Sequence, residues 1–257
     1  MKRLNDVDAL QTWRKSLPRG ETIGFVPTMG ALHPGHSSLM ERARRECDRV
    51  VVSIFVNPTQ FNDPEDCAKY PQPLDQDLAI CDALGVDAAF TPLRDSLYPD
   101  DYRYRVTEGE ASRILEGAFR PGHFDGVLTV VLKLFNLVRA DRAYFGEKDW
   151  QQLQLVQGMS RAFFLDTEVI PCSTVREPDG LAMSSRNVRL SPEGRAKAAA
   201  FPRILRTTAT PQGASEALTA EGFKVEYVED HNGRRLAAIV HEGVRLIDNI
   251  PLVEVIA

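Results

Sequence analysis

The fold is decided by residues 22–56, which have the sequence TIGFVPTMGALHPGHSSLMERARRECDRVVVSIFV. The apolar, β-branched runs at 22–26 and 50–56 are bounded by turn residues, and such runs are typical of strands that are covered on both faces. Between them, residues 37–46 are helix formers whose apolar side chains recur on one face. The stretch therefore predicts a strand–loop–helix–strand unit with parallel strands.

The same alternation of apolar runs and helical patterns continues along the chain. Helices are predicted at 75–84, 124–138 and 149–164, and strands at 88–91, 142–145 and 167–175. Repeated alternation of strands and helices predicts an α/β fold with a doubly wound parallel sheet. Such a sheet binds ligands at the carboxyl ends of its strands.

The pattern changes after Arg176. Three kinds of segment follow it: a loop-like one at 177–189, a helical one at 192–205, and short strands at 225–247 around the hairpin signal Asn232–Gly233. We therefore expect two domains. Residues 1–176 form the doubly wound domain, and residues 177–257 form a smaller α+β domain.

Composition and charge exclude several classes of protein. The 257 residues carry a formal net charge of −5, whereas a general nucleic-acid surface needs clustered Lys and Arg. Residues 1–13 lack the apolar core of a signal peptide, and the most apolar stretch, 127–138, is far shorter than the ~20 residues of a membrane-spanning helix. The four cysteines show neither C-x-x-C nor zinc spacing, which indicates reduced packing residues. We expect a cytoplasmic protein with no nucleic-acid or membrane partner.

The first chemical motif is PTMGALHPGH at residues 27–36, between the first predicted strand and helix. Gly30 and Gly35 let the backbone approach a ligand, and the helix start offers N–H groups and a positive dipole end to phosphate oxygens. His33 and His36 can donate hydrogen bonds to the same phosphate chain. The alternatives are capping or packing roles, or an i, i+3 metal pair, for which no third ligand is evident.

Three further polar segments follow predicted strands or join the two predicted domains. They are FVNPTQF at 55–61, GEKDWQQ at 146–152 and MSSRN at 183–187. Gln60 offers two donors and an acceptor to a neutral polar group, and Lys148 is a point charge for phosphate. The alternatives are an Asn-Pro turn, a charged turn at a helix start and a solvated linker.

Together the four segments resemble the pantothenate synthetase family from Phe25 to about Leu190. The matching runs are FVPTMGALHPGH, SIFVNPTQF, LEGAFRPGHFDGVLTVVLKLFNLVRADRAYFGEKDWQQL and REPDGLAMSSRN. The family belongs to the HxGH nucleotidyltransferase superfamily and has a Rossmann-like N-terminal domain and a smaller C-terminal domain. The resemblance implies an ATP-dependent condensation of pantoate with β-alanine to pantothenate, through pantoyl-adenylate and with release of AMP and pyrophosphate.

The resemblance also implies which residues contact ATP. They are Met29, Gly30, Ala31, Leu32, His33, Pro34, Gly35, His36, Gly146, Glu147, Lys148, Asp149, Val175, Met183, Ser184, Ser185 and Arg186. His36 matches the proton donor of the family. We expect His33, Lys148 and Arg186 to act with it on the phosphates.

The residues that match the substrate pocket are Asn57, Tyr70, His123, Gln60 and Gln152. The last two hold pantoate in the family, and Gln60 also lies near the β-alanine site. Mg²⁺ is implied as the partner of ATP that bridges phosphate oxygens, with no protein ligand assigned. Asp77 is a weak candidate for an indirect magnesium contact, and a solvated carboxylate on a helix face is the favoured interpretation.

The chain departs from the family at Gln72 and Arg189, and we expect it to be shorter than typical members after Leu190. A smaller lid that leaks pantoyl-adenylate to water is therefore predicted. Two alternatives stay open: another HxGH nucleotidyltransferase that makes a different adenylate or dinucleotide, and a catalytically impaired nucleotide-binding homologue. A homodimer is implied by the resemblance alone.

Overall fold

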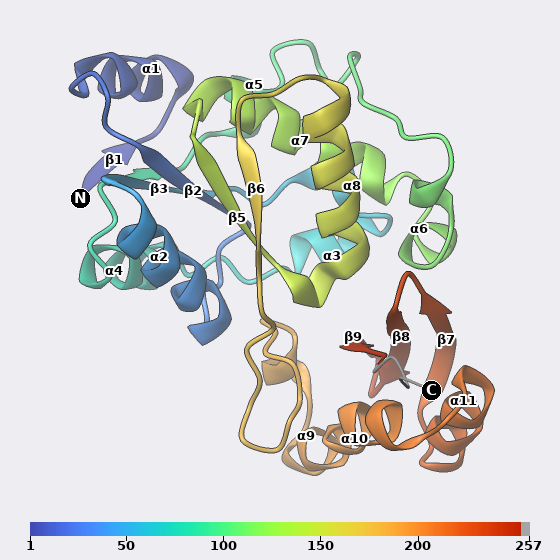
Figure 1. Cartoon of the computed structure of the whole chain (residues 1–257). Coiled ribbons are helices and arrows are strands. Elements are labelled where there is room, and N and C mark those ends of the chain that lie inside the picture. Colours follow the sequence, from blue (N-terminus) through green and yellow to red (C-terminus); the bar gives the residue numbers. More distant parts are fainter. Residues whose placement is uncertain (253–257) are drawn as a thin grey trace, which may run out of the picture. The chain divides into compact units, whose positions relative to one another are not determined.

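The computed structural model describes residues 1–252 and contains two compact units (Figure 1). The first unit consists of Met1–Glu147 and Gln151–Cys172. The second joins Lys148–Trp150 to the chain that begins at Ser173.

The first unit is built on a six-stranded sheet in which every pair of neighbours is parallel. Its strands are β1 (Lys2–Leu4), β2 (Ile23–Thr28), β3 (Arg49–Ile54), β4 (Ala88–Phe90), β5 (Arg142–Gly146) and β6 (Glu168–Cys172). The order is β1-β4-β3-β2-β5-β6. From β2 the chain adds β3 and β4 on one side of that strand, and it then adds β5 and β6 on the other side. The strand order reverses between β2 and β5, and doubly wound sheets generally bind ligands at the carboxyl ends of the strands beside such a reversal.

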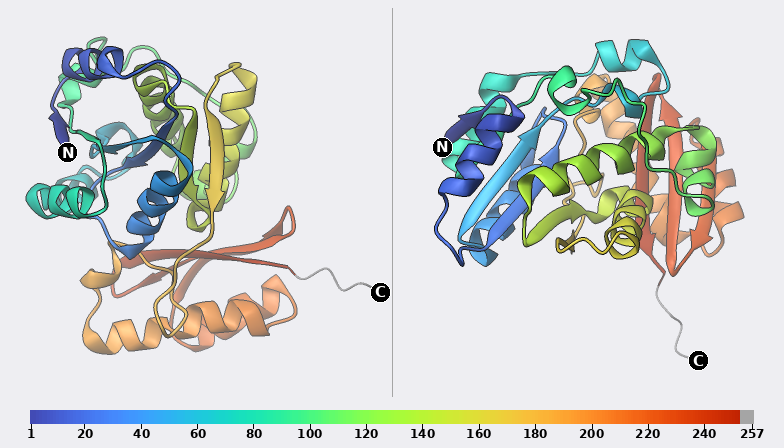
Figure 2. Two further views of the ribbon diagram at one scale, coloured as in Figure 1. Left: turned by 60° about the vertical axis from the view of Figure 1, so that its left-hand side comes forward. Right: turned by 90° about the horizontal axis from the view of Figure 1, so that it is seen from above.

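Helices cover both faces of this sheet (Figures 1 and 2). They are α1 (Val7–Ser16), α2 (Pro34–Glu46), α3 (Pro64–Ala68), α4 (Leu74–Ala83), α5 (Arg94–Leu97), α6 (Glu116–Phe119), α7 (His123–Val138) and α8 (Trp150–Ala162), with 3₁₀ turns η1 (Pro58–Gln60), η2 (Ala111–Arg113) and η3 (Glu147–Asp149). Successive strand residues point to opposite faces. Val26 packs in the core beneath α2 and α4, whereas the ring of Phe25 meets Phe135 of α7 at 6.4 Å.

The predicted strand–helix–strand unit and the doubly wound parallel sheet are confirmed. The pattern predicts no element before residue 22, whereas the structure has β1 and α1 there. A three-residue strand such as β1 is too short to show a periodicity. The short helices α5 and α6 are likewise absent from the prediction.

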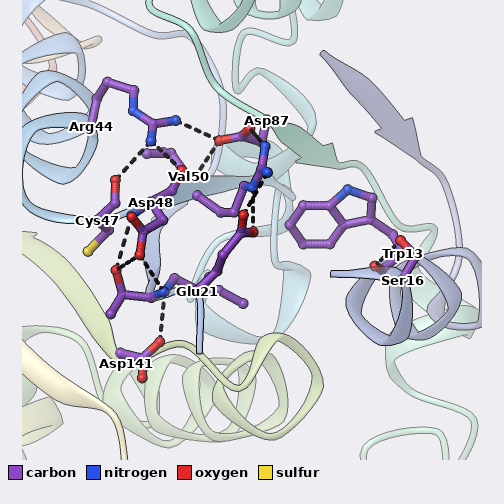
Figure 3. A network of polar contacts seen from close by, with 12 residues as sticks. Trp13, Ser16, Glu21, Arg44, Cys47, Asp48, Val50, Asp87 and Asp141 are labelled. Carbon is purple, nitrogen blue, oxygen red and sulfur yellow. Dashed lines mark hydrogen bonds and ion pairs between the residues drawn. The ribbon is translucent and has the colours of Figure 1, made fainter. Parts of the chain in front are cut away.

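Carboxylates accept backbone N–H groups at the amino edge of the sheet, where the strands begin (Figure 3). Near the strand starts, Asp48, Asp87 and Asp141 accept backbone N–H groups of Thr22, Val50 and Ile23, respectively, at 2.7–2.8 Å. Asp87 also pairs with Arg44 at 2.7 Å and with Arg49 at 3.0 Å, and Arg49 makes two hydrogen bonds to Glu21. We call this set of residues the amino-edge network.

The second unit contains an antiparallel sheet of β7 (Lys224–His231), β8 (Arg234–His241) and β9 (Val244–Pro251). Three helices pack on this sheet around an apolar core: α9 (Pro192–Ala198), α10 (Ala200–Thr207) and α11 (Pro211–Ala220). Figure 2 shows the helices on one face of the sheet. The hairpin predicted at Asn232–Gly233 is confirmed, since both residues have positive φ, +48° and +73°. The single helix predicted at 192–205 is two helices that meet at Ala199.

None of the helices within residues 1–252 is both long and apolar enough to cross a membrane. The four cysteines are unpaired, and Cys47, Cys81 and Cys172 are buried. Burial raises the pKa of the Cys81 thiol to about 12, so this thiol stays protonated in the core.

Candidate functional site

Two of the predicted motifs lie side by side because β2 and β3 are paired neighbours in the sheet. The register sets Thr28, the last residue of β2, against Ile54, the last residue of β3. Residues 29–33 follow the first strand and lead into α2, and residues 55–60 follow the second and end in η1. Both loops therefore leave the same carboxyl edge, where doubly wound sheets bind ligands.

The two histidines of the first loop form a capping box at the start of α2. The Nδ1 atom of His33 accepts the backbone N–H of Gly35 at 3.1 Å, and Nδ1 of His36 accepts the backbone N–H of His33 at 3.3 Å. Their ring centroids are 4.1 Å apart. Because each Nδ1 is an acceptor, the neutral rings carry their proton on Nε2. The structure therefore confirms the capping alternative. Capping uses the Nδ1 atoms, so it is compatible with hydrogen bonding to phosphate through Nε2–H.

The loop before His33 is held by a carboxylate from another helix. Asp77, in the first turn of α4, accepts the backbone N–H of Ala31 at 2.9 Å through Oδ2 and that of Leu32 at 2.8 Å through Oδ1. Asp77 is 1% exposed. The favoured sequence interpretation, a solvated carboxylate on a helix face, is therefore wrong. Its helix face is apolar because Leu78 and Cys81 are buried with it, and the i, i+4 spacing of Asp77 and Cys81 was the available signal.

The second loop is organised by a fully buried asparagine. Asn57 Nδ2 donates to Gln60 Oε1 at 3.0 Å and to the carbonyl oxygen of Gly126 at 3.2 Å. Its Oδ1 accepts from Thr59 Oγ1 at 3.0 Å and from the Tyr98 hydroxyl at 2.9 Å. These four contacts occupy the hydrogen-bonding capacity of the Asn57 side chain. Asn57 therefore orients the side chain of Gln60.

The amide of Gln60 has a defined orientation. Its Oε1 accepts from Asn57, and its Nε2 lies 3.2 Å from the Met29 sulfur, which links the second loop to the first. The amide NH₂ thus points toward the loop that carries the histidines.

His123, the first residue of α7, supports the main chain of Gln60. One ring nitrogen, Nδ1, lies 2.8 Å from the Gln60 carbonyl oxygen, and the other, Nε2, lies 3.1 Å from Arg120 Nη1. An arginine can only donate, so Nε2 is the acceptor and Nδ1 donates to the carbonyl. His123 therefore has the opposite tautomer from His33 and His36.

Close packing brings α7 onto this loop. A Cβ atom built on Gly126 would lie 2.4 Å from the carbonyl oxygen of Thr59 and 2.7 Å from the backbone nitrogen of Gln60. Only glycine allows this approach between the helix and η1.

Tyr70, the remaining residue predicted for the substrate pocket, is half-buried. Its ring contacts that of Phe61 edge-on, with the ring centroids 5.9 Å apart.

Adjacent glutamines of α8 have different surroundings. Gln151 is buried: its Oε1 accepts from the backbone N–H of Glu116 at 2.9 Å, and its Nε2 donates to the carbonyl oxygens of Ala111 at 2.7 Å and Ile114 at 2.8 Å. Gln152 is half-buried. Neighbouring residues of a helix point in different directions. The amide of Gln151 therefore binds main-chain groups, whereas that of Gln152 does not share those partners. The family resemblance identified only Gln152. The sequence analysis did not predict that Gln151 supports the fold.

The predicted segment Gly146–Asp149 lies where β5 ends. Gly146 is the last residue of β5, the neighbour of β2, and η3 follows it directly. The carbonyl oxygen of Lys148 accepts from Asn249 Nδ2 at 2.9 Å within the second unit.

In the second unit, a small hairpin brings Val175 and Met183 together. Met183 donates its backbone N–H to the carbonyl oxygen of Val175 at 3.0 Å, and Arg176 forms an antiparallel bridge with Ala182. The segment predicted to be loop-like, 177–189, contains turns, one bridged residue, Ala182, and a 3₁₀ turn, η4 (Asn187–Arg189), so the prediction is confirmed. Long-range pairing with β9 stabilises the hairpin, because Arg176 makes two hydrogen bonds, at 2.7 and 2.8 Å, to the buried carboxylate of Asp248. No local sequence signal marks that pair.

The serines and arginine that follow form a turn. The backbone N–H of Arg186 donates to Ser184 Oγ at 3.2 Å, and that of Asn187 donates to the Ser184 carbonyl oxygen at 3.1 Å. Asn187 then anchors the turn through its Nδ2, which donates to the Ala182 carbonyl oxygen at 3.1 Å. Val175 and Met183–Arg186 thus form one continuous structure in the second unit.

A reversing parallel sheet with an HxGH turn at the carboxyl end of β2 defines a Rossmann-like nucleotide-binding enzyme of the HxGH type. A family model described as pantoate-beta-alanine ligase matches residues 2–251. The chain belongs to this family. Its activity is the ATP-dependent ligation of pantoate to β-alanine.

Known relatives match nearly the whole chain. A pantothenate synthetase of Bdellovibrio bacteriovorus is 55% identical over 249 residues, which is 97% of this chain and 98% of the relative. A pantoate-beta-alanine ligase of Francisella tularensis, solved in complex with beta-gamma ATP and beta-alanine, has a TM-score of 0.94 at 42% identity and covers 98% of this chain and 97% of that one. The pantothenate synthetase of Thermus thermophilus has a TM-score of 0.90 at 44% identity, with 98% and 99% covered.

These coverages bear on the expected shortening after Leu190. Each of these three relatives is matched over at least 97% of its own length, so this chain lacks no substantial segment that they possess. No shortening is evident relative to these three relatives, and the leak of pantoyl-adenylate itself stays a prediction.

Proposed function

We propose that the HxGH loop catalyses adenylation of pantoate and that the same site then completes the amide bond. In the first step a pantoate carboxylate oxygen attacks the α-phosphorus of ATP, the bond to the β-phosphate oxygen breaks, and pyrophosphate leaves. In the second, the β-alanine amine attacks the acyl carbon of pantoyl-adenylate, AMP leaves, and the amine gives up a proton. The observation that carries the proposal is the pair of histidines whose Nδ1 atoms are held by backbone N–H groups, which fixes their donors on Nε2.

The nucleotide is proposed to contact residues 29–36, Gly146–Asp149, Val175 and Met183–Arg186. Fixed Nε2–H donors can stabilise negative charge that develops on phosphate oxygens, and they need no reorganisation during the reaction. His36 is the proposed proton donor. Lys148 and Arg186 supply positive charge, and the hydroxyls of Ser184 and Ser185 supply further donors.

Mg²⁺ is proposed to accompany ATP. Among residues 1–252, no three His, Cys, Asp or Glu side chains are grouped so that they could hold a metal ion. Magnesium in nucleotide sites often keeps waters and binds mainly to phosphate oxygens, so the ion needs no such group of side chains. Lys148 and Arg186 would then share the phosphate charge with the ion.

Pantoate is proposed to bind beside Gln60 and Gln152. Asn57 already donates to Oε1 of Gln60, so the Nε2 amide is proposed to donate to a substrate oxygen, and the second lone pair of Oε1 can accept a substrate hydroxyl. Asn57 and His123 act through Gln60, and Tyr70 completes the wall of the pocket. Gln60 also contributes to the β-alanine site.

We further propose that residues 1–176 bind nucleotide and pantoate and that residues 177–257 act as a lid. Membership of the family supports a homodimer. The unpaired cysteines are typical of a reducing compartment and support the cytoplasm.

The test is to measure pyrophosphate, AMP and pantothenate with pantoate and β-alanine added singly and together. Pyrophosphate release is expected with ATP and pantoate, and one AMP per pantothenate when β-alanine is also present. Pyrophosphate release without pantoate would indicate a different nucleotidyltransferase, and ATP binding without turnover would indicate an impaired homologue. Either result would overturn the proposal.

A further inference from the structure

We propose that Asp77 is a positioning residue, whose carboxylate fixes the backbone of Gly30–Leu32 and, through it, the two histidines. The inference deepens the proposed function and rests on it, because it assigns to Asp77 the geometry of the loop that acts on the phosphates. Neither a substrate contact nor a metal contact is needed for this role.

The contact is direct and spans a long separation in the chain. One carboxylate oxygen accepts the N–H of Ala31, and the other accepts that of Leu32. In the sequence, Asp77 is 46 positions from Ala31 and 45 from Leu32. Hydrogen bonds to an ionised acceptor are stronger than those to a neutral one. A pair of them on consecutive N–H groups fixes the plane and direction of the loop.

The backbone at this point is one that side chains other than glycine avoid. Gly30 has φ +82° and Ala31 has φ +51°. A Cβ atom at residue 30 would lie 2.8 Å from Asp77 Oδ2, so the carboxylate packs directly on the glycine. Left-handed conformations of alanine persist when the surroundings over-determine them. Asp77 supplies that constraint.

A short path of hydrogen bonds leads from Asp77 to the rings. Leu32, held by Oδ1 of Asp77, precedes His33 in the chain. The backbone N–H of His33 donates to Nδ1 of His36, and Nδ1 of His33 accepts from Gly35. A movement of Leu32 therefore moves the donor that sets the tautomer and direction of His36.

The side chain must be a carboxylate to do this. The isosteric amide of asparagine has one oxygen, so it would turn an NH₂ group toward one of the two N–H donors. The position of Asp77 is also poor for magnesium, since the carboxylate is 1% exposed and both its oxygens already accept protein N–H groups.

The experiment compares D77N with D75N in the full chain. Asp75 is an exposed carboxylate in the same first turn of α4 and is a matched control. D77N is expected to lower the rate of pyrophosphate release between about 10-fold and about 100-fold, the range for a slight misplacement of catalytic groups. KM for pantoate stays within about twofold, as expected when the change touches no pantoate contact. D75N should equal the wild type.

A magnesium titration separates positioning from metal binding. If Asp77 is a positioning residue, the magnesium concentration that gives half-maximal activity is the same in D77N and in the wild type. A rise of about tenfold or more, comparable with losses seen when groups around a metal are removed, would overturn the proposal in favour of a metal contact.

Two double variants test the path. D77N/H36A should lose no more activity than H36A alone, because Asp77 acts through the histidines, whereas multiplied losses would overturn the proposal. A31G/D77N should recover part of the D77N loss, since glycine adopts positive φ without strain. No recovery would also contradict it.

Hydrogen exchange in the wild-type protein tests the contact even if D77N does not fold. The amides of Ala31 and Leu32 should be protected, and rapid exchange of both would overturn the inference. This measurement does not depend on turnover. A wild type that releases no pyrophosphate would therefore refute the proposed function while leaving the Asp77 contact open to its own test.

Discussion

The two edges of the parallel sheet use carboxylates in different ways. At the amino edge, Asp48, Asp87 and Asp141 each hold a backbone N–H near a strand start, and arginines surround Asp87 (Figure 3). At the carboxyl edge, Asp77 is buried and holds two N–H groups of one loop. At the first edge several carboxylates each hold one N–H group, whereas at the second edge one carboxylate holds two consecutive N–H groups, next to the bond from the Gly30 N–H to Thr28 Oγ1.

The difference has a physical consequence. The carboxylates of the amino-edge network stand near solvent, which screens them, and the loss of one leaves others in place. A hydrogen bond to a buried charged group contributes about 1.5–3 kcal/mol, and the left-handed turn at Ala31 costs roughly 1–2 kcal/mol. Changes at the amino edge should therefore alter stability, whereas changes at the carboxyl edge should alter the reaction.

The largest effect is expected at the carboxyl edge from His36→Ala. Removing a preorganised donor to transition-state charge lowers the rate by about 10²-fold or more. Pyrophosphate release with saturating ATP and pantoate is the measurement. His231→Ala, on β7 of the second unit, is the control and should be neutral. Near-normal release from a folded His36→Ala protein would remove His36 from the mechanism.

The glutamine pair of α8 sharpens the comparison within one helix. Gln152→Ala should raise KM for pantoate by about tenfold, the scale of one lost hydrogen bond to substrate, while the Kd for ATP changes little.

Gln151→Ala should instead lower the free energy of unfolding by about 1–3 kcal/mol, since it leaves the N–H of Glu116 and two carbonyl oxygens without this partner. Steady-state kinetics and urea unfolding of both variants separate the two roles. Equal loss of ATP and pantoate affinity in Gln152→Ala would mean that this residue supports the whole site.

Acid should weaken the amino edge. The hydrogen bond from Arg49 holds the pKa of Glu21 below its usual range, and the backbone N–H of Thr22 does the same for Asp48. A carboxylate with a lowered folded-state pKa stabilises the protein above its unfolded pKa of about 4, and this contribution disappears as the pH falls through the folded value. Glu21→Gln should therefore flatten the dependence of Tm on pH between about 6 and 3, with kcat unchanged at neutral pH. The same slope in both proteins would contradict the assignment.

The smallest effect concerns Tyr98, whose hydroxyl donates to Asn57, a residue that we propose acts on pantoate through Gln60. Burial raises the pKa of Tyr98 to about 12. A group with a raised folded-state pKa stabilises the fold fully below its unfolded pKa of about 10, and this contribution is lost as the pH rises toward the folded value. Urea midpoints of the wild type should fall above about pH 10, and Tyr98→Phe should show a shallower fall. Parallel curves would exclude Tyr98 as the titrating group.

Helices, strands and turns that are determined by residues close together in the sequence could be predicted from it. The apolar runs around residues 22–56 and the one-sided pattern of α2 indicate a parallel β–α–β unit, because burial on both faces of a strand and on one face of a helix leaves a periodic record. Asn232–Gly233 marks its hairpin because few other residues accept two consecutive positive φ values. The motifs around the two histidines, Gln60 and Lys148 likewise point to the family.

What the sequence by itself determined is the class of fold, the family and the residue types at the carboxyl edge. Tertiary structure decided which polar side chains are buried against the main chain and which remain exposed or half-buried. Asp75 and Asp77 are alike in a helix first turn, and Gln151 and Gln152 are alike in chemistry, yet one of each pair is buried on backbone N–H or carbonyl groups. Those partners lie 35 to 46 positions away along the chain. Local spacing can mark the buried face of a helix, as it does for Asp77 and Cys81. It does not identify the distant partners, because those contacts form only when the whole unit has folded.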